Sequence, residues 1–131
     1  MILVTPDDLP KHWELVEAGL LEIIRRTQEK WTPVHVKQAI NEGWASLFIC
    51  DDGFVVLQRL KALWTAEPYI NVWAMWFPPG KGKARREELV AWLDQITSES
   101  KCGWWEFSSP REGWAGLPDC EKARTTWRRK K

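Results

Sequence analysis

The amino-acid sequence predicts one α/β domain over residues 1–131, built on a mixed, mostly antiparallel sheet with helices on both of its faces. Three observations predict this class. Segments with apolar residues at helical spacing are interspersed along the chain with short apolar runs typical of strands. A chain of 131 residues has the size of one domain and can bury a sizeable core. The sequence also has no internal repeat, linker or low-complexity stretch apart from its basic end at 128–131.

The chain is predicted to begin with a strand and two helices. Ile2–Val4 is a short apolar run, and the residues after it carry oxygens that can cap a helix. The first helix should end near Gln28, because apolar residues recur at steps of three and four before it: Trp13, Val16, Leu20 and Ile24. Thr32 and Pro33 suit the N-cap and first position of a second helix, and Gly43 suits its left-handed stop.

Three strands are predicted in the middle of the chain. Residues 44–50 and 54–60 are apolar runs joined by Asp51-Asp52-Gly53, and an Asp-Gly pair between such runs is a strong hairpin signal. Residues 69–77 are nearly continuous in apolar character, which is typical of a central strand covered on both faces. The two prolines that follow should end this strand, because proline cannot donate to a strand ladder.

The rest of the chain is predicted to hold one more helix and two more strands. The helix should cover 85–100, the first strand Trp104–Ser108, and a turn or short helix 110–117. A last edge strand over 123–129 would carry on one face Ala123, Thr125 and Trp127. We expect 69–77 and Trp104–Ser108 to be parallel neighbours, because a helix of this length is the usual crossover between parallel strands.

Composition and residue spacing exclude several classes of protein. The net charge of +1 favours no particular partner. No apolar run approaches the roughly 18 residues that cross a bilayer, and the N-terminus lacks the basic and apolar regions of a signal peptide. The widely spaced Cys50, Cys102 and Cys120 indicate reduced thiols in a cytoplasmic protein. Because His12 and His35 lie far apart, no zinc site is predicted, and catalysis by a Cys102–histidine pair is disfavoured.

Tryptophan is the unusual component of this sequence, with 11 residues. Each indole supplies a large buried area, so a core filled with bulky rings is one interpretation. Tryptophan is also enriched at binding surfaces, so rings that line a groove or an interface are the other interpretation. The sequence leaves both interpretations open.

Residues 79–86 join the predicted central strand to the helix after it and combine glycines with cations. Glycines at such a junction let the backbone approach a ligand closely, and the free N–H groups of a helix start favour an anion. Cations at this end of a helix are unfavourable unless something negative offsets them, and a phosphate-bearing ligand would do so. Because Glu87 and Glu88 offset part of the charge, a solvated, self-compensating loop is the alternative. The cations are Lys81, Lys83, Arg85 and Arg86.

The order of elements around this loop resembles the GNAT fold of N-acetyltransferases. In that family a central strand leads into a loop of pattern Arg/Gln-x-x-Gly-x-Gly/Ala, which holds the pyrophosphate of acetyl-CoA. Residues 79–84 match the pattern at Gly82 and Ala84, while Pro79 stands where Arg or Gln is usual. The segment 109–114 is similar to small, diverged GNAT-like proteins of tailed bacteriophages.

This resemblance implies an acetyl-CoA site and a set of site residues. Backbone groups near Met75 and Phe77 would hydrogen-bond pantetheine, and the pyrophosphate would lie on Gly80, Lys81, Gly82, Lys83, Ala84 and Arg85. A carboxylate, either Glu67 or Glu106, would take a proton from the acceptor amine. Glu106 should face away from the aromatic residues on either side of it. Each glutamate could equally be a solvated surface carboxylate. The family often uses a tyrosine after the fifth strand to protonate the departing thiolate, and the one tyrosine here is Tyr69.

The resemblance implies an acyl-CoA-binding protein that can transfer an acetyl group to an amine on a small molecule or a protein. The alternative is a non-catalytic, GNAT-like phage protein that acts as a virion component or an interaction module. Either protein would work in the cytoplasm, that of the host if a phage encodes it, or in the virion. Basic clusters at 81–86 and 122–131 could hold nucleic acid, but the balanced charge disfavours this function.

Overall fold

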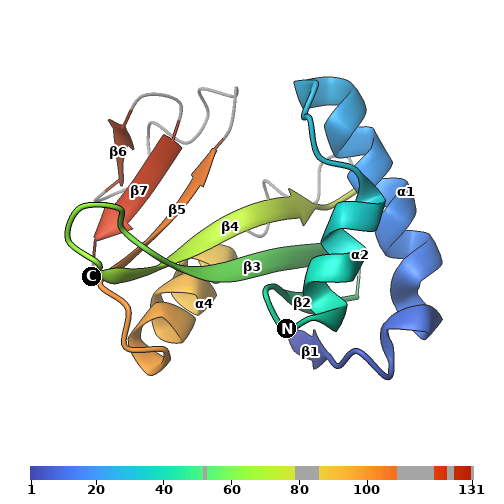
Figure 1. Ribbon diagram of the computed structural model, residues 1–131, viewed down its shortest axis with the longest axis horizontal. Coiled ribbons are helices and arrows are strands. Elements are labelled where there is room, and N and C mark those ends of the chain that lie inside the picture. Colours follow the sequence, from blue (N-terminus) through green and yellow to red (C-terminus); the bar gives the residue numbers. More distant parts are fainter. Residues whose placement is uncertain (52, 79–85, 109–119, 124–125, 131) are drawn as a thin grey trace. The chain divides into compact units, whose positions relative to one another are not determined.

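Figure 1 shows the computed structural model, which describes residues 1–51, 53–78, 86–108, 120–123 and 126–130. The chain divides into two compact units. The first comprises Met1–Leu57 and Ala74–Lys83, and the second comprises Gln58–Trp73 and Ala84–Lys131. Strands β3 (Gly53–Lys61) and β4 (Pro68–Trp76) each have residues in both units. The expectation of one domain over 1–131 stays a prediction.

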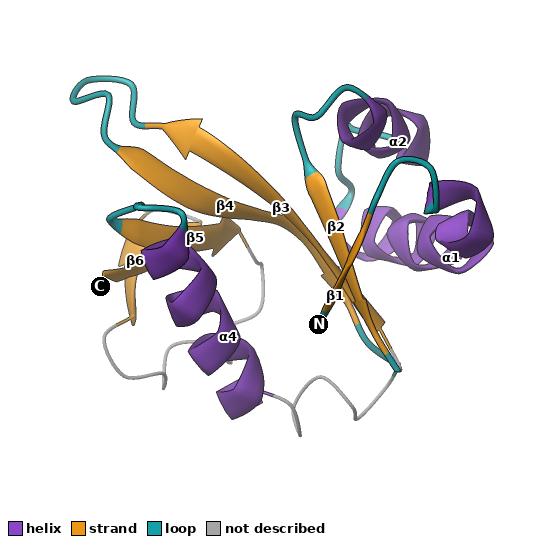
Figure 2. Ribbon diagram, turned by 90° about the horizontal axis from the view of Figure 1, so that it is seen from below, coloured by secondary structure: helices purple, strands orange, loops and turns teal. Residues whose placement is uncertain are grey.

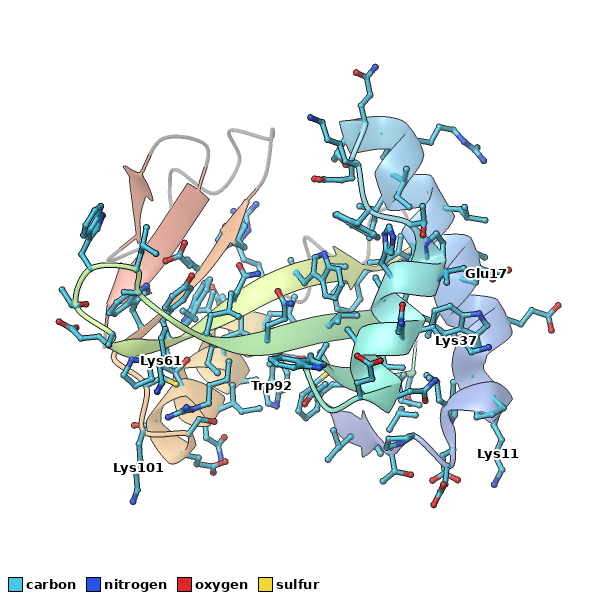
Figure 3. The ribbon with its side chains drawn as sticks, viewed as in Figure 1. Lys11, Glu17, Lys37, Lys61, Trp92 and Lys101 are labelled. Atoms are coloured by element: carbon cyan, nitrogen blue, oxygen red, sulfur yellow. The ribbon has the colours of Figure 1, made fainter. Side chains whose placement is uncertain are left out.

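The first unit combines two helices with the antiparallel strands that begin the sheet. Its elements besides β3 and β4 are β1 (Ile2–Val4), α1 (Leu9–Thr27), α2 (Pro33–Asn41) and β2 (Ser46–Cys50). Strand β2 pairs antiparallel with both β1 and β3. The helices α1 and α2 lie side by side (Figure 2), and the Lys37 Nζ lies 5.4 Å from the ring centroid of Trp13. The Nε1 of Trp13 donates to Glu17 Oε2 at 3.1 Å, and Figure 3 labels Lys37 and Glu17.

The ends of the two helices follow from local sequence signals. Thr32 has an extended backbone (φ −121°) ahead of α2, and its N–H donates to His35 Nδ1 at 3.0 Å. Gln28 ends α1 in the left-handed conformation (φ 54°), with its N–H on the carbonyl of Ile24 at 2.8 Å. Gly43 follows α2 with a φ of +83°, which glycine adopts without strain. The predicted starts and stops are therefore confirmed to within a residue or two.

Apolar side chains from every layer of the first unit form its core. Val16 and Leu20 of α1, Val36 of α2, Leu47 of β2 and Phe54 of β3 are all fully buried. Burying side chains of this size contributes about 1.5–3 kcal/mol each. The helical spacing of apolar residues in the sequence thus marks the faces that α1 and α2 bury.

The second unit is built around a parallel pair of strands. It contains the end of β3, most of β4, and α4 (Arg86–Glu99), β5 (Trp104–Ser108), β6 (Cys120–Ala123) and β7 (Thr126–Lys130). Strand β4 runs parallel to β5, with Ile70 opposite Trp105 and Val72 opposite Phe107. Strand β7 pairs antiparallel with both β5 and β6. The parallel pair joined by α4 confirms the prediction made from the length of that helix.

Helix α4 packs on β5 in the second unit. Trp105 is fully buried, and its Nε1 donates to Asp94 Oδ1 of α4 at 2.9 Å. The rings of Trp105 and Phe107 stack with centroids 5.7 Å apart. Leu89 and Leu93 are buried on the same helix. The described pairings and helices confirm the α/β class and the mixed, mostly antiparallel sheet.

Two details of the predicted strands were wrong. The predicted last edge strand over 123–129 is a hairpin, because Ala123 of β6 pairs with Thr126 of β7. Strand β7 therefore has a neighbour on each side. In the earlier hairpin, Cys50 pairs with Gly53, so Gly53 belongs to β3 and is not part of the connection. The predicted turn or short helix at 110–117 lies outside the described residues.

Candidate functional site

The end of β4 is held in the first unit by the side chain of Trp76. The Nε1 of Trp76 donates to Glu22 Oε2 of α1 at 2.7 Å, in a partly buried setting. Its ring stacks with that of Phe54 of β3, with centroids 6.1 Å apart and planes 21° apart. Contacts from a helix and a strand thus fix the orientation of this indole.

Two glycines allow these close contacts. A β-carbon at Gly19 of α1 would lie 2.5 Å from Phe54 Cε1 and 3.1 Å from Trp76 Cδ2. A β-carbon at Gly53 would lie 2.3 Å from the carbonyl oxygen of Trp76 and 2.4 Å from Phe77 Cδ1. Real β-carbons essentially never approach other atoms within 3.0 Å, and the contacts to Phe54, to the Trp76 carbonyl and to Phe77 all fall below that distance. Any larger residue at either position would therefore displace the end of β4 or the Phe54 ring.

The residues predicted to bind the cofactor lie at and after this end of β4. Met75 and Phe77 are half-buried on either side of Trp76. The pairing of β4 with β5 covers Ile70 to Val72, and β4 continues beyond it to Trp76. The other predicted cofactor residues lie outside the described residues: Gly80, Lys81, Gly82, Lys83, Ala84 and Arg85. Helix α4 begins at Arg86 and carries acidic residues in its first turn, which the helix dipole favours.

Glu106 lies in the second unit, at the middle of β5. Its side chain is half-buried, whereas the residues on either side of it, Trp105 and Phe107, are buried. This alternation of burial agrees with the prediction that Glu106 faces away from the aromatic residues on either side of it. Glu106 Oε1 accepts a hydrogen bond from Trp104 Nε1 at 2.8 Å. The ring of Trp104 stacks in turn on that of Tyr69 of β4, with centroids 5.2 Å apart and planes 4° apart.

Glu67, the other predicted base, has a different setting. It lies in the turn between β3 and β4, where its side chain is exposed. Its backbone N–H donates to Thr65 Oγ1 at 3.3 Å, and its carbonyl accepts from Ala62 N–H at 2.8 Å. The backbone of Glu67 therefore makes hydrogen bonds that stabilise this turn. Of the two carboxylates, only Glu106 lies on a strand within a row of polar and aromatic side chains.

Sequence reasoning missed the polar neighbours of Glu106. Asn71 of β4 is its register partner, and Asn71 Nδ2 donates to Gln58 Oε1 of β3 at 2.9 Å. On the other side, Arg128 of β7 occupies the register position opposite Glu106. Polar residues thus occupy aligned positions on four neighbouring strands. The signal for Asn71 was its position in the alternation of the two strand faces along 69–77. Because aromatic residues occupy much of that segment, it reads as continuously apolar and the alternation is not evident.

Glu22 was also missed as a contact of the candidate site. It is an acidic residue on a helix rich in charge, and its partner Trp76 is far from it in sequence. Nothing local to either residue predicts the bond. Among the described residues, no cluster of potential metal ligands is present. Cys50 Sγ donates to the carbonyl of Gly53 at 3.6 Å, and Cys102 Sγ to that of Ser100 at 3.7 Å.

The described tryptophans divide between the two interpretations made from composition. Trp105 is fully buried, as a core ring should be. Trp64 and Trp44 have 92 % and 71 % of their surface exposed. Trp76 and Trp104 are half-buried and bind carboxylates through their indole nitrogens. Among the described tryptophans, some therefore fill the core and others lie at the surface.

Comparisons with solved structures identify the fold. A probable acetyltransferase superposes with a TM-score of 0.69 at 9 % identity, covering 94 % of this chain and 92 % of that one. A GNAT-family acetyltransferase from Listeria monocytogenes gives 0.60 at 10 %, covering 93 % and 90 %. An aminoglycoside acetyltransferase from an uncultured soil metagenomic sample, in complex with trehalose, gives 0.62 at 14 %, covering 92 % and 88 %. No family model and no curated protein matches the sequence.

These likenesses extend over most of the chain and of each neighbour. At such low identity they show a shared fold, and that fold is the one of the GNAT acetyltransferases. The fold implied by the sequence resemblance is confirmed. No described helix is long and apolar enough to span a membrane. The similarity to phage proteins, the cytoplasmic or virion location and the partners stay predictions.

Proposed function

We propose that this protein binds acetyl-CoA or a related acyl-CoA and transfers the acyl group to an amine. One observation supports this proposal above the others. Strand β4 continues past its pairing with β5 and leads into the sequence Gly-Lys-Gly-Lys-Ala, which precedes α4. In a GNAT fold this is the position of the cofactor loop, and the sequence at 79–84 matches the family pattern at Gly82 and Ala84.

The proposed binding site uses backbone groups and cations. The backbone of Met75 and Phe77 would hydrogen-bond the pantetheine arm. Glycines at 80 and 82 would let the backbone approach the pyrophosphate, and α4 would direct the positive end of its dipole to it. The charge of the phosphates would be neutralised by Lys81, Lys83 and Arg85. The bound cofactor would supply an acyl group activated as a thioester.

The proposed chemistry places a general base on β5. Glu106 would take a proton from the acceptor ammonium, and the free amine would then attack the acyl carbon, forming the C–N bond as the C–S bond breaks. The nitrogen would release its second proton to solvent as the amide forms. Trp104 would hold the carboxylate through the bond at Oε1. The family's usual tyrosine acid has no counterpart after β5, so the thiolate would leave unprotonated and turnover would be slow. Glu67, exposed in a turn, is the less favoured base.

Calorimetric titration of the full chain with acetyl-CoA tests this proposal. We expect saturable binding that Gly82→Trp abolishes, because the bulky side chain blocks backbone approach. Gly103→Trp serves as the matched control, since Gly103 is exposed and a β-carbon there meets nothing within 4 Å. Millimolar acetyl-CoA that changes neither heat nor melting temperature in the wild type would overturn the proposal.

Turnover is measured separately from binding. Release of free thiol is followed with acetyl-CoA and a panel of small amines, aminoglycosides and peptides. Binding without turnover on any acceptor would leave a cofactor-binding GNAT fold and reject the transferase step. No finding from the fold comparison favours the non-catalytic phage alternative.

A further inference from the structure

The indole of Trp76 has partners on helix α1 and on strand β3 of the first unit. Glu22 of α1 accepts its N–H at 2.7 Å, and Phe54 of β3 stacks on its ring. Helix α1 comes close enough that a β-carbon at Gly19 would lie 3.1 Å from Trp76 Cδ2. The second carboxylate oxygen of Glu22 binds Arg26, one turn further along α1. Both oxygens of this carboxylate are therefore used.

The backbone of Trp76 is fixed as well as its ring. Its carbonyl oxygen lies so close to Gly53 of β3 that no side chain fits between them. Trp76 is the last residue of β4 and stands between Met75 and Phe77. The indole is joined covalently to the Cα between these two neighbours, so contacts that hold the ring also restrict displacement of the backbone at Met75 and Phe77. The strand end is thus held by the contacts of this side chain together with the close approach of Gly53 to the backbone.

We infer that Glu22 is a positioning residue for the acyl-CoA site: by holding the Trp76 indole, its carboxylate fixes the backbone of Met75 and Phe77. This inference rests on the proposed function, in which that backbone binds the pantetheine arm. A carboxylate is the strongest acceptor a side chain offers to an N–H, and the partly buried setting shields the bond from water. Phe54 stacking alone leaves the indole free to slide in its own plane, whereas the bond to Glu22 does not.

The test compares the affinity of four full-length variants for acetyl-CoA by calorimetry. Glu22→Leu removes the acceptor, and we expect affinity to fall about tenfold, the effect of losing one hydrogen bond to a charged group. Glu22→Gln keeps an oxygen for the indole and should restore affinity to within about threefold of the wild type. Arg26→Ala removes the ion pair but keeps the indole bond, so its affinity should stay at the wild-type value.

The fourth variant separates positioning from loss of stability. Val16→Ala opens a cavity at a fully buried site on the same helix and lowers stability while keeping both partners of the Glu22–Trp76 bond. All titrations are made at a temperature at which melting curves show every variant folded. We expect Val16→Ala to bind acetyl-CoA like the wild type.

The outcomes distinguish this inference from the proposed function. If the wild type does not bind acetyl-CoA, the proposed function fails. If the wild type binds and Glu22→Leu binds equally well, the positioning role of Glu22 is wrong and the function stands. If Glu22→Leu and Val16→Ala weaken binding equally, Glu22 acts only on stability, which also rejects the inference. Weak binding by Glu22→Leu alone, restored in Glu22→Gln, supports it.

Discussion

A β-carbon at Gly53 would lie 2.3 Å from the carbonyl oxygen of Trp76, so the first residue of β3 must be small for β4 to end where it does. The sequence assigns Gly53 to a hairpin turn, where glycine is expected for its backbone freedom. The structure gives another reason for glycine here, which is the close approach of a second backbone. The same close approach brings Phe77 Cδ1 to 2.4 Å from this position.

Gly53→Ala is therefore predicted to destabilise the fold. The added methyl meets a backbone oxygen, which cannot swing aside as a flexible side chain can, so we expect a loss of about 1–3 kcal/mol in the free energy of unfolding. Denaturant unfolding measures the loss. Gly103→Ala is the control, because a β-carbon there meets nothing within 4 Å, and its effect should stay within about 0.5 kcal/mol. Equal effects of the two substitutions would show that steric crowding at Gly53 is not decisive.

Gly19→Ala tests the contact of α1 with Phe54. Alanine in place of glycine normally stabilises a helix interior by about 1 kcal/mol. Here the methyl would lie 2.5 Å from Phe54 Cε1, so we expect a net destabilisation of about 1–2 kcal/mol instead. In a Phe54→Leu background the alanine should cost less, since the ring it strikes is gone. Additive losses in this double-mutant cycle would contradict the steric explanation.

Much of the fold could be predicted because its signals are local. Gly43 and Thr32-Pro33 mark helix ends by backbone conformation and capping alone. Strand β5 stands out as a short aromatic run after Gly103, and its parallel pairing with β4 follows from the length of α4. Each of these signals lies within the element that it defines.

The errors and omissions have physical reasons as well. The hairpin between β6 and β7 connects at 124–125, where Arg and Thr provide no turn signal, so one strand was predicted instead of two. The Glu22–Trp76 bond joins residues that only the tertiary fold brings together. Asn71 lies within an apolar run, so its place in a row of polar residues is recognised only once the sheet aligns it with Gln58 and Glu106.

Trp105→Phe is predicted to weaken the packing of α4 on β5. The substitution leaves a gap at a fully buried site and removes the donor to Asp94 Oδ1, so we expect a loss of about 2–4 kcal/mol. Asp94→Asn keeps an oxygen that can accept the indole N–H and should cost under about 1 kcal/mol. Thermal and denaturant unfolding measure both. A larger loss for Asp94→Asn than for Trp105→Phe would mean that the carboxylate charge, and not the indole bond, stabilises this contact.

Glu106→Gln and Glu67→Gln together test the proposed base. Glutamine at 106 still offers Trp104 Nε1 an oxygen, so the variant should fold and bind acetyl-CoA normally while losing the group that accepts the proton. We expect its turnover to fall by about 10²–10⁴-fold, the usual contribution of a general base. Glu67→Gln changes an exposed turn residue and should leave turnover unchanged. If Glu106→Gln retains full turnover while Glu67→Gln loses it, the base has been assigned to the wrong carboxylate.

Wild-type turnover itself should lie well below the enzyme median of about 10 s⁻¹, because no tyrosine after β5 protonates the thiolate. Tyr69→Phe keeps the ring that stacks on Trp104 and should change turnover little.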